Sequence, residues 1–232
     1  MNLQRTLASE CTRAFTVVEL LVVVAIIAML EAILFPVFSR AKNVAKGTAC
    51  LSNLRQIGQG TLLYMGDSDD LFPYMVDAGD RAEPGQWASY PAFMADIPQI
   101  PLVQDLLQSY TKSREIFRCP SDTGTAVIDD LDPLVAFLGS PSDYATFGSS
   151  YFYRTKLTIL QETQTSLAKP ADANLLYDAA GHWHGAGGEM LLEDSLEVAA
   201  DKRRQYRYNT LFADMHAKSL TSDQRESGFA QD

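Results

Sequence analysis

An apolar run near the N-terminus constrains the fold of this chain more than any other feature. Nineteen residues lie between Glu19 and Ser39, and Glu31 is the only charged residue among them. As an α-helix, the stretch from Phe15 to Arg40 would rise about 38 Å, which exceeds the ~30 Å hydrocarbon thickness of a bilayer. The run therefore predicts a helix that can span a membrane.

A cleaved secretory signal peptide is the competing interpretation of this run. The residues Ser39, Arg40 and Ala41 weakly imitate a small-x-small cleavage site. The apolar core of a signal peptide normally has about 7 to 15 residues, however, and this run is longer. We therefore favour an uncleaved membrane anchor over cleavage after Ala41.

The charge distribution predicts the orientation of the anchor and excludes one class of partner. The chain has 232 residues, enough for one head domain and an appendage, and a net charge of -10. Binding to a polyanion needs clustered Lys and Arg, so we expect no nucleic-acid partner. Residues 1–14 carry Arg5, Arg13 and Glu10, a local net of +1 that leaves -11 on the remainder. The basic flank predicts a cytoplasmic N-terminus and a head outside.

Glu19 is the residue in this run that most needs an explanation. A carboxylate in the apolar part of a membrane helix costs a few kcal/mol, so one is usually retained for a partner. If the chain is cut between Ala14 and Phe15, the new amino group lies four residues before Glu19. It would also lie beside Glu19 of a neighbouring copy staggered by about one helical turn, where the two charges could pair in a low-dielectric setting.

The stretch "RAFTVVELLVVVAIIAML" resembles the prepilin processing site of type IV pilins and type II secretion pseudopilins. That site joins a basic leader, a small residue, Phe, Thr, two hydrophobic residues, Glu and a long apolar helix. The resemblance implies that a prepilin peptidase cuts after Ala14 and methylates the amine of Phe15, and that Glu19 guides docking into a filament. The family almost always has Gly where this chain has Ala14. Pro36 lies where such helices often carry a proline, and it predicts a helix bend.

Glu31 is a second departure from the family pattern. It lies about 24 Å along the helix from Phe15, near the outer membrane interface. A partly hydrated interfacial carboxylate is favoured there over a second contact between subunits.

The segment after Pro36 continues as an amphipathic helix to about Tyr64. Gly47, Gly58 and Gly60 lower its helix propensity. Its apolar stripe should lie against a sheet. The stripe consists of residues at three- and four-residue steps: Val44, Cys50, Leu51, Leu54, Ile57, Thr61, Leu62 and Met65.

The head is expected to be a mainly antiparallel sheet with long loops. Apolar residues alternate or cluster as in strands over 149–160, 173–180, 189–196, 208–214 and 216–220. The last two segments form a predicted hairpin at Asp214 and Met215. Residues 102–110 predict a short helix, and residues 75–101 and 122–149 are expected to be irregular.

The head also resembles a large bacterial group of pilin-like proteins named for a His, nine residues and then Asp-Gly. "FRCPSD", "LLYDAA" and "NTLFADMHAKSL" carry this similarity, but Arg204 and Met215 occupy the signature's His and Gly positions. Together the two resemblances predict an α+β, pilin-like fold. Its parts are a prepilin leader (1–14), a transmembrane and filament-core helix (15–38), an amphipathic helix on the head (39–66) and the globular head (67–232).

The cysteines leave two interpretations open. Cleavage after Ala14 would remove Cys11, leaving Cys50 and Cys119. In an oxidising compartment this pair could form a disulfide that ties the helix to the head. Two free, buried thiols are the alternative.

The histidines gather late in the chain, near two aspartates. They are His182, His184 and His216, close to Asp178 and Asp214. His182 and His184 would share one face of a strand, and an added carboxylate could complete a zinc site. Packing or surface roles for the histidines are favoured.

The remaining motifs point away from metal binding and catalysis. Asp67, Asp69 and Asp70 could bind calcium, but a solvated acidic loop is favoured over a site without a full ligand set. The sequence has no nucleophile elbow, phosphate loop, paired-cysteine zinc spacing or metalloprotease helix. We therefore expect no cofactor, no metal and no enzymatic activity.

These features favour a structural subunit of a type IV pilus-like or type II secretion pseudopilus-like filament. Its expected partners are a prepilin peptidase, other pilin or pseudopilin subunits, an inner-membrane assembly platform and the lipid bilayer. The expected location is the bacterial cytoplasmic membrane, and then a filament in the periplasm or at the cell surface. The alternative is an anchored extracytoplasmic binding protein that uses loops around Trp87 and Trp183, and a metal-dependent enzyme ranks third.

Overall fold

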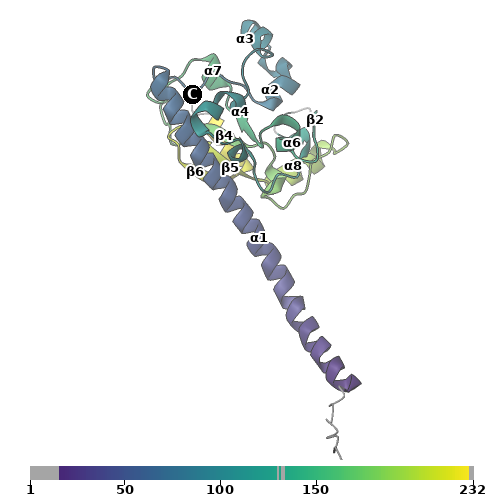
Figure 1. The fold of residues 1–232 in the computed structure, drawn as a ribbon. Coiled ribbons are helices and arrows are strands. Elements are labelled where there is room, and N and C mark those ends of the chain that lie inside the picture. The colour runs from purple at the N-terminus through teal and green to yellow at the C-terminus, as the bar shows by residue number, and fades with distance from the viewer. Residues whose placement is uncertain (1–15, 130, 132–133, 230–232) are drawn as a thin grey trace, which may run out of the picture. The chain divides into compact units, whose positions relative to one another are not determined.

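The computed structural model describes residues 16–129, 131 and 134–229, and Figure 1 shows the fold. Two compact units divide the chain, residues 1–42 and residues 43–232. The leader, with Cys11 and Ala14, and Phe15 lie outside the described residues.

The first unit contains the apolar part of helix α1 (Val17–Asp67). Every described residue of this unit, from Thr16 to Lys42, is exposed. Within the described chain, α1 is the one helix long and apolar enough to cross a membrane. Pro36 lies inside α1, which is helical on both sides of it, and the bend expected there stays a prediction.

In the second unit, the rest of α1 buries one stripe of side chains. Thr61 fits in this apolar stripe because its hydroxyl donates a hydrogen bond to the Ile57 carbonyl at 3.1 Å. Val44 and Leu62, which the sequence placed on the stripe, are exposed, and Leu51 is half-buried. The buried positions of the stripe are Cys50, Leu54, Ile57, Thr61 and Met65.

Two glycines on this stripe allow other segments to approach the helix backbone. A Cβ at Gly58 would lie 3.0 Å from Leu211 Cδ1, and a Cβ at Gly60 would lie 2.5 Å from Thr111 Cγ2. These glycines are buried, so the propensity they cost the helix is offset by close packing.

A four-stranded antiparallel sheet lies at the centre of the head, in the order β3-β4-β5-β6. The predicted hairpin is confirmed: β5 and β6 pair, and the turn between them places Met215 in the left-handed region at φ 70°. A long N-terminal apolar helix with a small antiparallel sheet gives the α+β class that the sequence predicted. The strands are β3 (Tyr151–Tyr153), β4 (Asn174–Asp178), β5 (Arg207–Phe212) and β6 (Ala217–Thr221).

The largest apolar core lies between this sheet and α1. It joins Leu54 and Ile57 of the helix to Tyr151, Leu176 and Leu211 of the strands. Cys50 belongs to the same core, so the buried stripe of α1 places it against the sheet, whose strands β3 and β4 are buried throughout.

Short elements surround the sheet (Figure 1). A second, two-stranded antiparallel sheet pairs β1 with β2. The elements are α2 (Ala78–Ala82), η1 (Pro84–Trp87), α3 (Pro91–Asp96), α4 (Val103–Leu106), α5 (Gln108–Thr111), η2 (Glu115–Phe117), β1 (Thr125–Ile128), β2 (Val135–Gly139), α6 (Asp143–Phe147), α7 (Lys156–Ile159), η3 (Gly181–Trp183), α8 (Leu196–Arg204) and α9 (Ser222–Phe229).

Two predicted strands are wrong in part or in full. Segment 149–160 is a strand only over β3 and then turns into α7. There the Thr158 hydroxyl donates to the Pro73 carbonyl at 2.8 Å, which anchors the turn to the segment after α1, a contact distant in sequence. Segment 189–196 has no strand. It leads into α8, whose N-cap is Ser195, with Oγ accepting from Val198 N at 3.3 Å.

The two regions expected to be irregular contain regular elements. Residues 75–101 hold α2, η1 and α3, and α2 begins with a reciprocal cap between Asp77 and Asp80. Residues 122–149 hold the β1-β2 hairpin and α6.

Candidate functional site

Thr16 and Glu19 close the first turn of α1 by bonding to each other. Thr16 N donates to Glu19 Oε2 at 2.9 Å, and the Thr16 hydroxyl donates to the same oxygen at 2.7 Å. In return, Glu19 N donates to Thr16 Oγ1 at 3.2 Å. This arrangement is a capping box, and the Thr-x-x-Glu spacing that marks it is visible in the sequence. Sequence reasoning missed it, because the only partner it considered for Glu19 was the amine freed at Phe15, in the same chain or in a neighbouring one.

The predicted processing residues directly precede this turn in the sequence. Ala14 and Phe15 lie outside the described residues, so cleavage and methylation stay predictions. The pairing of Glu19 with an amine of a neighbouring chain also stays a prediction. Both residues of the capping box would remain after a cut behind Ala14.

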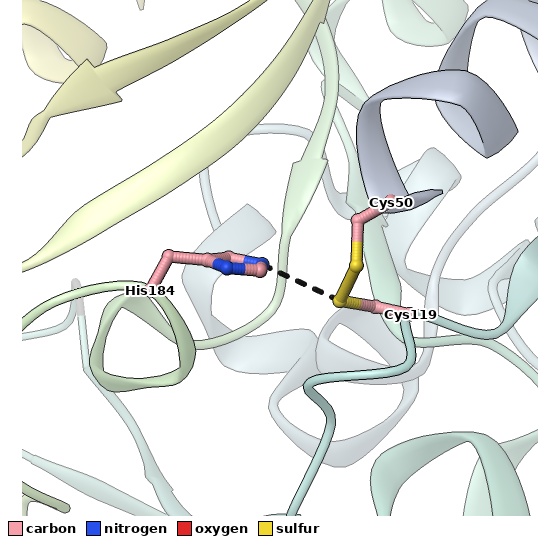
Figure 2. A group of neighbouring side chains, drawn as sticks. All are labelled: Cys50, Cys119 and His184. Carbon is pink, nitrogen blue, oxygen red and sulfur yellow. Dashed lines mark hydrogen bonds between the residues drawn. A yellow bond between two sulfur atoms is a disulfide. The ribbon is translucent and has the colours of Figure 1, made fainter. Parts of the chain in front are cut away.

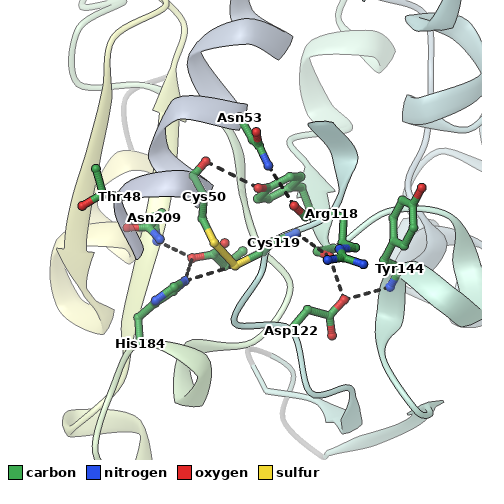
Figure 3. The surroundings of a disulfide bond; sticks show 12 residues. Thr48, Cys50, Asn53, Arg118, Cys119, Asp122, Tyr144, His184 and Asn209 are labelled. Carbon is green, nitrogen blue, oxygen red and sulfur yellow. Dashed lines mark hydrogen bonds and ion pairs between the residues drawn. A yellow bond between two sulfur atoms is a disulfide. The ribbon is translucent and has the colours of Figure 1, made fainter. Parts of the chain in front are cut away.

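A disulfide joins Cys50 of α1 to Cys119 in the loop after η2 (Figure 2). Both cysteines are buried, and their Cα atoms are 4.8 Å apart. Beside it, Asn53 Nδ2 donates to the Arg118 carbonyl at 2.8 Å (Figure 3). The structure therefore ties the helix to the head by a covalent bond and an adjacent hydrogen bond.

Asp122 organises the loop that carries Cys119 (Figure 3). Its Oδ2 accepts from the Ser150 hydroxyl at 2.6 Å and from Tyr144 N at 2.8 Å, and its Oδ1 accepts from Asp143 N at 3.0 Å. Ser150 Oγ in turn accepts from Cys119 N at 3.0 Å. These contacts fix the position of the Cys119 backbone.

Asp143 lies next to Asp122, and its side chain is fully buried. Burial, followed by the negative charge of Asp122, raises the pKa of Asp143 to about 9. A contact from the Thr125 backbone offsets part of this rise. The Asp143 carboxyl group is therefore protonated in the folded head at neutral pH.

His184 lies against the disulfide (Figure 2). Its Nε2 is 3.4 Å from Cys119 Sγ and 3.3 Å from Asp178 Oδ2, and Asp178 is completely buried. Burial, with a smaller contribution from the charge of Lys46, lowers the pKa of His184 to about 4. Burial likewise raises the pKa of Asp178, whose Oδ2 accepts from Asn209 N at 2.6 Å. Both shifts favour the neutral form of each side chain, so the 3.3 Å approach of His184 Nε2 to Asp178 Oδ2 joins two groups that burial pushes toward neutrality.

Four sequence-predicted residues thus meet in one buried group, which we call the Cys-His cluster: Cys50, Cys119, Asp178 and His184. In the sequence analysis, the pairing of the two cysteines and the role of the histidines were two unconnected predictions.

Comparisons of this chain with family models, with curated proteins and with solved structures found no match.

The other two histidines lie apart from this cluster. The strand that would place His182 and His184 on one face does not form, because residues 181–183 are a 3-10 turn. The ring of His182 instead lies 6.2 Å from that of Tyr206, and burial lowers its pKa to about 4. His216 Nδ1 is 2.5 Å from Asp214 Oδ1, and its ring stacks on Phe212.

The acidic loop ends α1. Asp67 is the last residue of the helix, and Asp69 and Asp70 have φ of 52° and 60°. Asp70 N donates to the Met65 carbonyl at 2.9 Å, so this segment is a C-terminal helix turn. Among the described residues, these aspartates do not form a group with metal-ligand spacing, whereas Cys50, Cys119 and His184 do.

The two tryptophans of the alternative binding hypothesis line different cavities. Trp87 borders a cavity of about 250 Å³, and its Nε1 donates to Asp80 Oδ1 at 2.6 Å. Trp183 borders a cavity of about 360 Å³, and its Nε1 donates to the Gly124 carbonyl at 3.1 Å. They therefore do not form one aromatic surface, and both indole N–H groups already have partners.

Proposed function

We propose that this chain is a structural subunit of a type IV pilus-like or type II secretion pseudopilus-like filament. It is made as a membrane-anchored precursor and processed before assembly. The observation that carries this proposal is the division of α1: its first part is apolar and exposed, and its second part is packed into the head. A basic leader ending in Ala14, followed by Phe15 and Glu19, supports the processing step.

The exposed part of α1 needs an apolar environment. Leu20, Leu21, Ile26 and Leu34 each expose more than half of their surface, with relative values of 58%, 61%, 55% and 65%. In the precursor, lipid would cover these side chains. In a filament, helices of neighbouring subunits would replace the lipid, which brings little hydrophobic gain because lipid tails are as apolar as leucine. Close packing and the Glu19 contact must therefore supply the specificity of assembly.

The mature N-terminus is the direct test of this function. We expect mass spectrometry of protein isolated from its native cells to find N-methylated Phe15 as the first residue. A native chain that still begins at Met1, with no polymer present, would refute the proposal and favour the anchored binding protein. A chain that begins at Lys42 would show that the apolar run is a cleaved signal peptide.

A pair of substitutions at Glu19 separates its charge from its capping role. The amide oxygen of Glu19→Gln can still accept from Thr16, so the capping box is kept and only the charge is lost. Glu19→Ala loses both. We expect both variants to insert into the membrane and to yield far less sedimentable filament than the wild type.

Glu31→Gln is the matched control, because it neutralises an exposed carboxylate on the same helix. We expect this variant to assemble normally. Normal filaments from Glu19→Gln, counted by electron microscopy, would show that assembly does not depend on the carboxylate charge.

A further inference from the structure

The Cys-His cluster presents the donor atoms of a metal site. The sulfur atoms of Cys50 and Cys119 and a ring nitrogen of His184 all lie within 4.8 Å of one another. Asp178 adds a carboxylate, with Oδ2 3.3 Å from His184 Nε2. Two sulfurs, one imidazole nitrogen and one carboxylate oxygen form a four-ligand set of the kind that zinc accepts.

The spacing of these atoms matches tetrahedral coordination. With Zn–S of about 2.3 Å and Zn–N and Zn–O of about 2.1 Å, tetrahedral angles place sulfur about 3.6 Å from nitrogen, and nitrogen about 3.4 Å from oxygen. The structure has 3.4 Å between Cys119 Sγ and His184 Nε2, and 3.3 Å between His184 Nε2 and Asp178 Oδ2. Two neighbouring pairs, sulfur with nitrogen and nitrogen with oxygen, therefore already stand at coordination spacing.

The fourth ligand is reached by a side-chain rotation. Two sulfurs bound to one zinc ion are about 3.8 Å apart, further than in a disulfide. The Cα atoms of Cys50 and Cys119 are 4.8 Å apart, so rotation about χ1 of either residue can separate the sulfurs by this amount. The thiol form can therefore place both sulfurs on one ion.

We propose that the dithiol form of the Cys-His cluster binds one divalent cation of the zinc class through Cys50 Sγ, Cys119 Sγ, His184 Nε2 and a carboxylate oxygen of Asp178. The disulfide and the metal use the same two sulfurs, so each excludes the other. Binding releases the two thiol protons. The dithiol form arises when two external thiols give two electrons and two protons to the Cys50–Cys119 bond, which breaks, and themselves become a disulfide. In the reverse direction, an external disulfide takes two electrons from the thiolates and two protons from water to become two thiols. The Cys50–Cys119 bond forms and the ion leaves.

The surroundings of the cluster suit a buried ion. Asp178 is completely buried, and its Oδ2, the oxygen 3.3 Å from His184 Nε2, accepts from the backbone N–H of Asn209 at 2.6 Å, as a metal ligand accepts from an outer partner.

A cavity beside α1 borders one residue of the cluster. The cavity of about 360 Å³ is bordered by His184, Thr48 and Ser219. Gly47 also borders it, and a Cβ there would lie 3.5 Å from His184 Nδ1. The cavity therefore reaches the Nδ1 side of the imidazole, while neither cysteine borders it.

Cobalt provides the test, because Co²⁺ bound to thiolates in a tetrahedral site absorbs strongly. The full chain in detergent is reduced with a phosphine, freed of reductant without oxygen and titrated with Co²⁺. We expect one Co²⁺ per chain, with cobalt–thiolate charge-transfer absorption and tetrahedral d–d bands, and competition by Zn²⁺. The oxidised chain should show none of these. Uptake by the reduced chain no greater than by the oxidised chain would overturn the proposal.

Two histidine variants make the test specific. His184→Ala should weaken Co²⁺ binding at least about 10-fold, the smallest loss seen even for outer-shell partners. His182→Ala is the matched control, since it removes a half-buried histidine two residues away, and it should bind as the wild type does. Equal affinities of the two variants would refute the assignment.

A kinetic measurement on the wild-type chain tests the site without any substitution. In the reduced wild-type chain, Zn²⁺ should slow alkylation of Cys50 and Cys119 at least about 10-fold, because bound thiolates are shielded. Alkylation at the same rate with and without Zn²⁺ would count against the site, including the case in which the reduced head has unfolded and Zn²⁺ does not refold it.

Discussion

Replacing either cysteine of the disulfide should remove a large part of the stability of the head. The bond links residues separated by 69 positions, so it restricts a long loop in the unfolded chain. The chain-entropy relation for a loop of this length gives about 4 kcal/mol at 25 °C. Since domains are typically stable by about 5–15 kcal/mol, Cys119→Ala should lose a quarter or more of the total.

A double-mutant cycle separates the bond from the side chains. Cys50→Ala and Cys119→Ala each break the same bond, so the double variant should lose little more than either single one. The coupling energy should therefore approach the full value of about 4 kcal/mol. Two independent buried thiols would instead give losses that add.

Urea unfolding of the full chain in detergent measures these differences through the fluorescence of Trp87 and Trp183. A chelator is included so that no metal replaces the disulfide. The reduced wild type should match the single variants within about 1 kcal/mol. Additive losses, or single-variant losses below about 1 kcal/mol, would refute the assignment of this stability to the disulfide.

Three further substitutions test the head. Burial and a neighbouring negative charge raise the pKa of Asp143 to about 9 from an unfolded value of 3.8, so the folded head keeps a proton that the unfolded chain releases. In the wild type, the free energy of unfolding should fall by up to about 1.4 kcal/mol per pH unit from about pH 4 to about pH 9. Asp143→Asn should flatten this slope and should stabilise the head by up to about 4 kcal/mol at pH 7. Identical slopes in urea titrations of the two proteins would contradict this. Leu54→Ala should lose about 2–5 kcal/mol because Leu54 is fully buried, whereas the exposed Leu63→Ala should lose less than about 0.5 kcal/mol, and similar losses would contradict the core assignment. Gly60→Ala should lower the melting temperature despite a propensity gain of about 1 kcal/mol, because the new Cβ would meet a threonine methyl at 2.5 Å, while Gly66→Ala, with open space, should raise it.

The sequence predicted the elements whose burial follows a local period. The buried stripe of α1 repeats every three or four residues, and the β5-β6 hairpin has strand-like segments on both sides of a short turn. It missed the β1-β2 hairpin within residues 122–149, where contacts distant in sequence decide the fold. Asp129, next to β1, accepts a hydrogen bond from Gly181 N at 2.9 Å, across 52 positions.

The sequence analysis named the residues of the candidate site, but it could not predict that they lie together. Cys50 and Cys119 were paired as a possibility, but their distance depends on how η2 packs against α1. His184 and His182 look equivalent in the sequence, and only the 3-10 turn at 181–183 directs one toward Cys119 and the other away. No local pattern encodes that choice.

The first turn of α1 has a consequence for how subunits would join. Glu19 Oε2 already accepts two hydrogen bonds from Thr16 within its own chain. An incoming amine from a second chain would therefore compete with a resident partner, and joining would be an exchange of contacts. The net free energy of such an exchange is the difference between two sets of bonds, which is small compared with either set. In such a joint the Glu19 contact would add little net free energy, so this contact alone would not prevent a subunit from leaving.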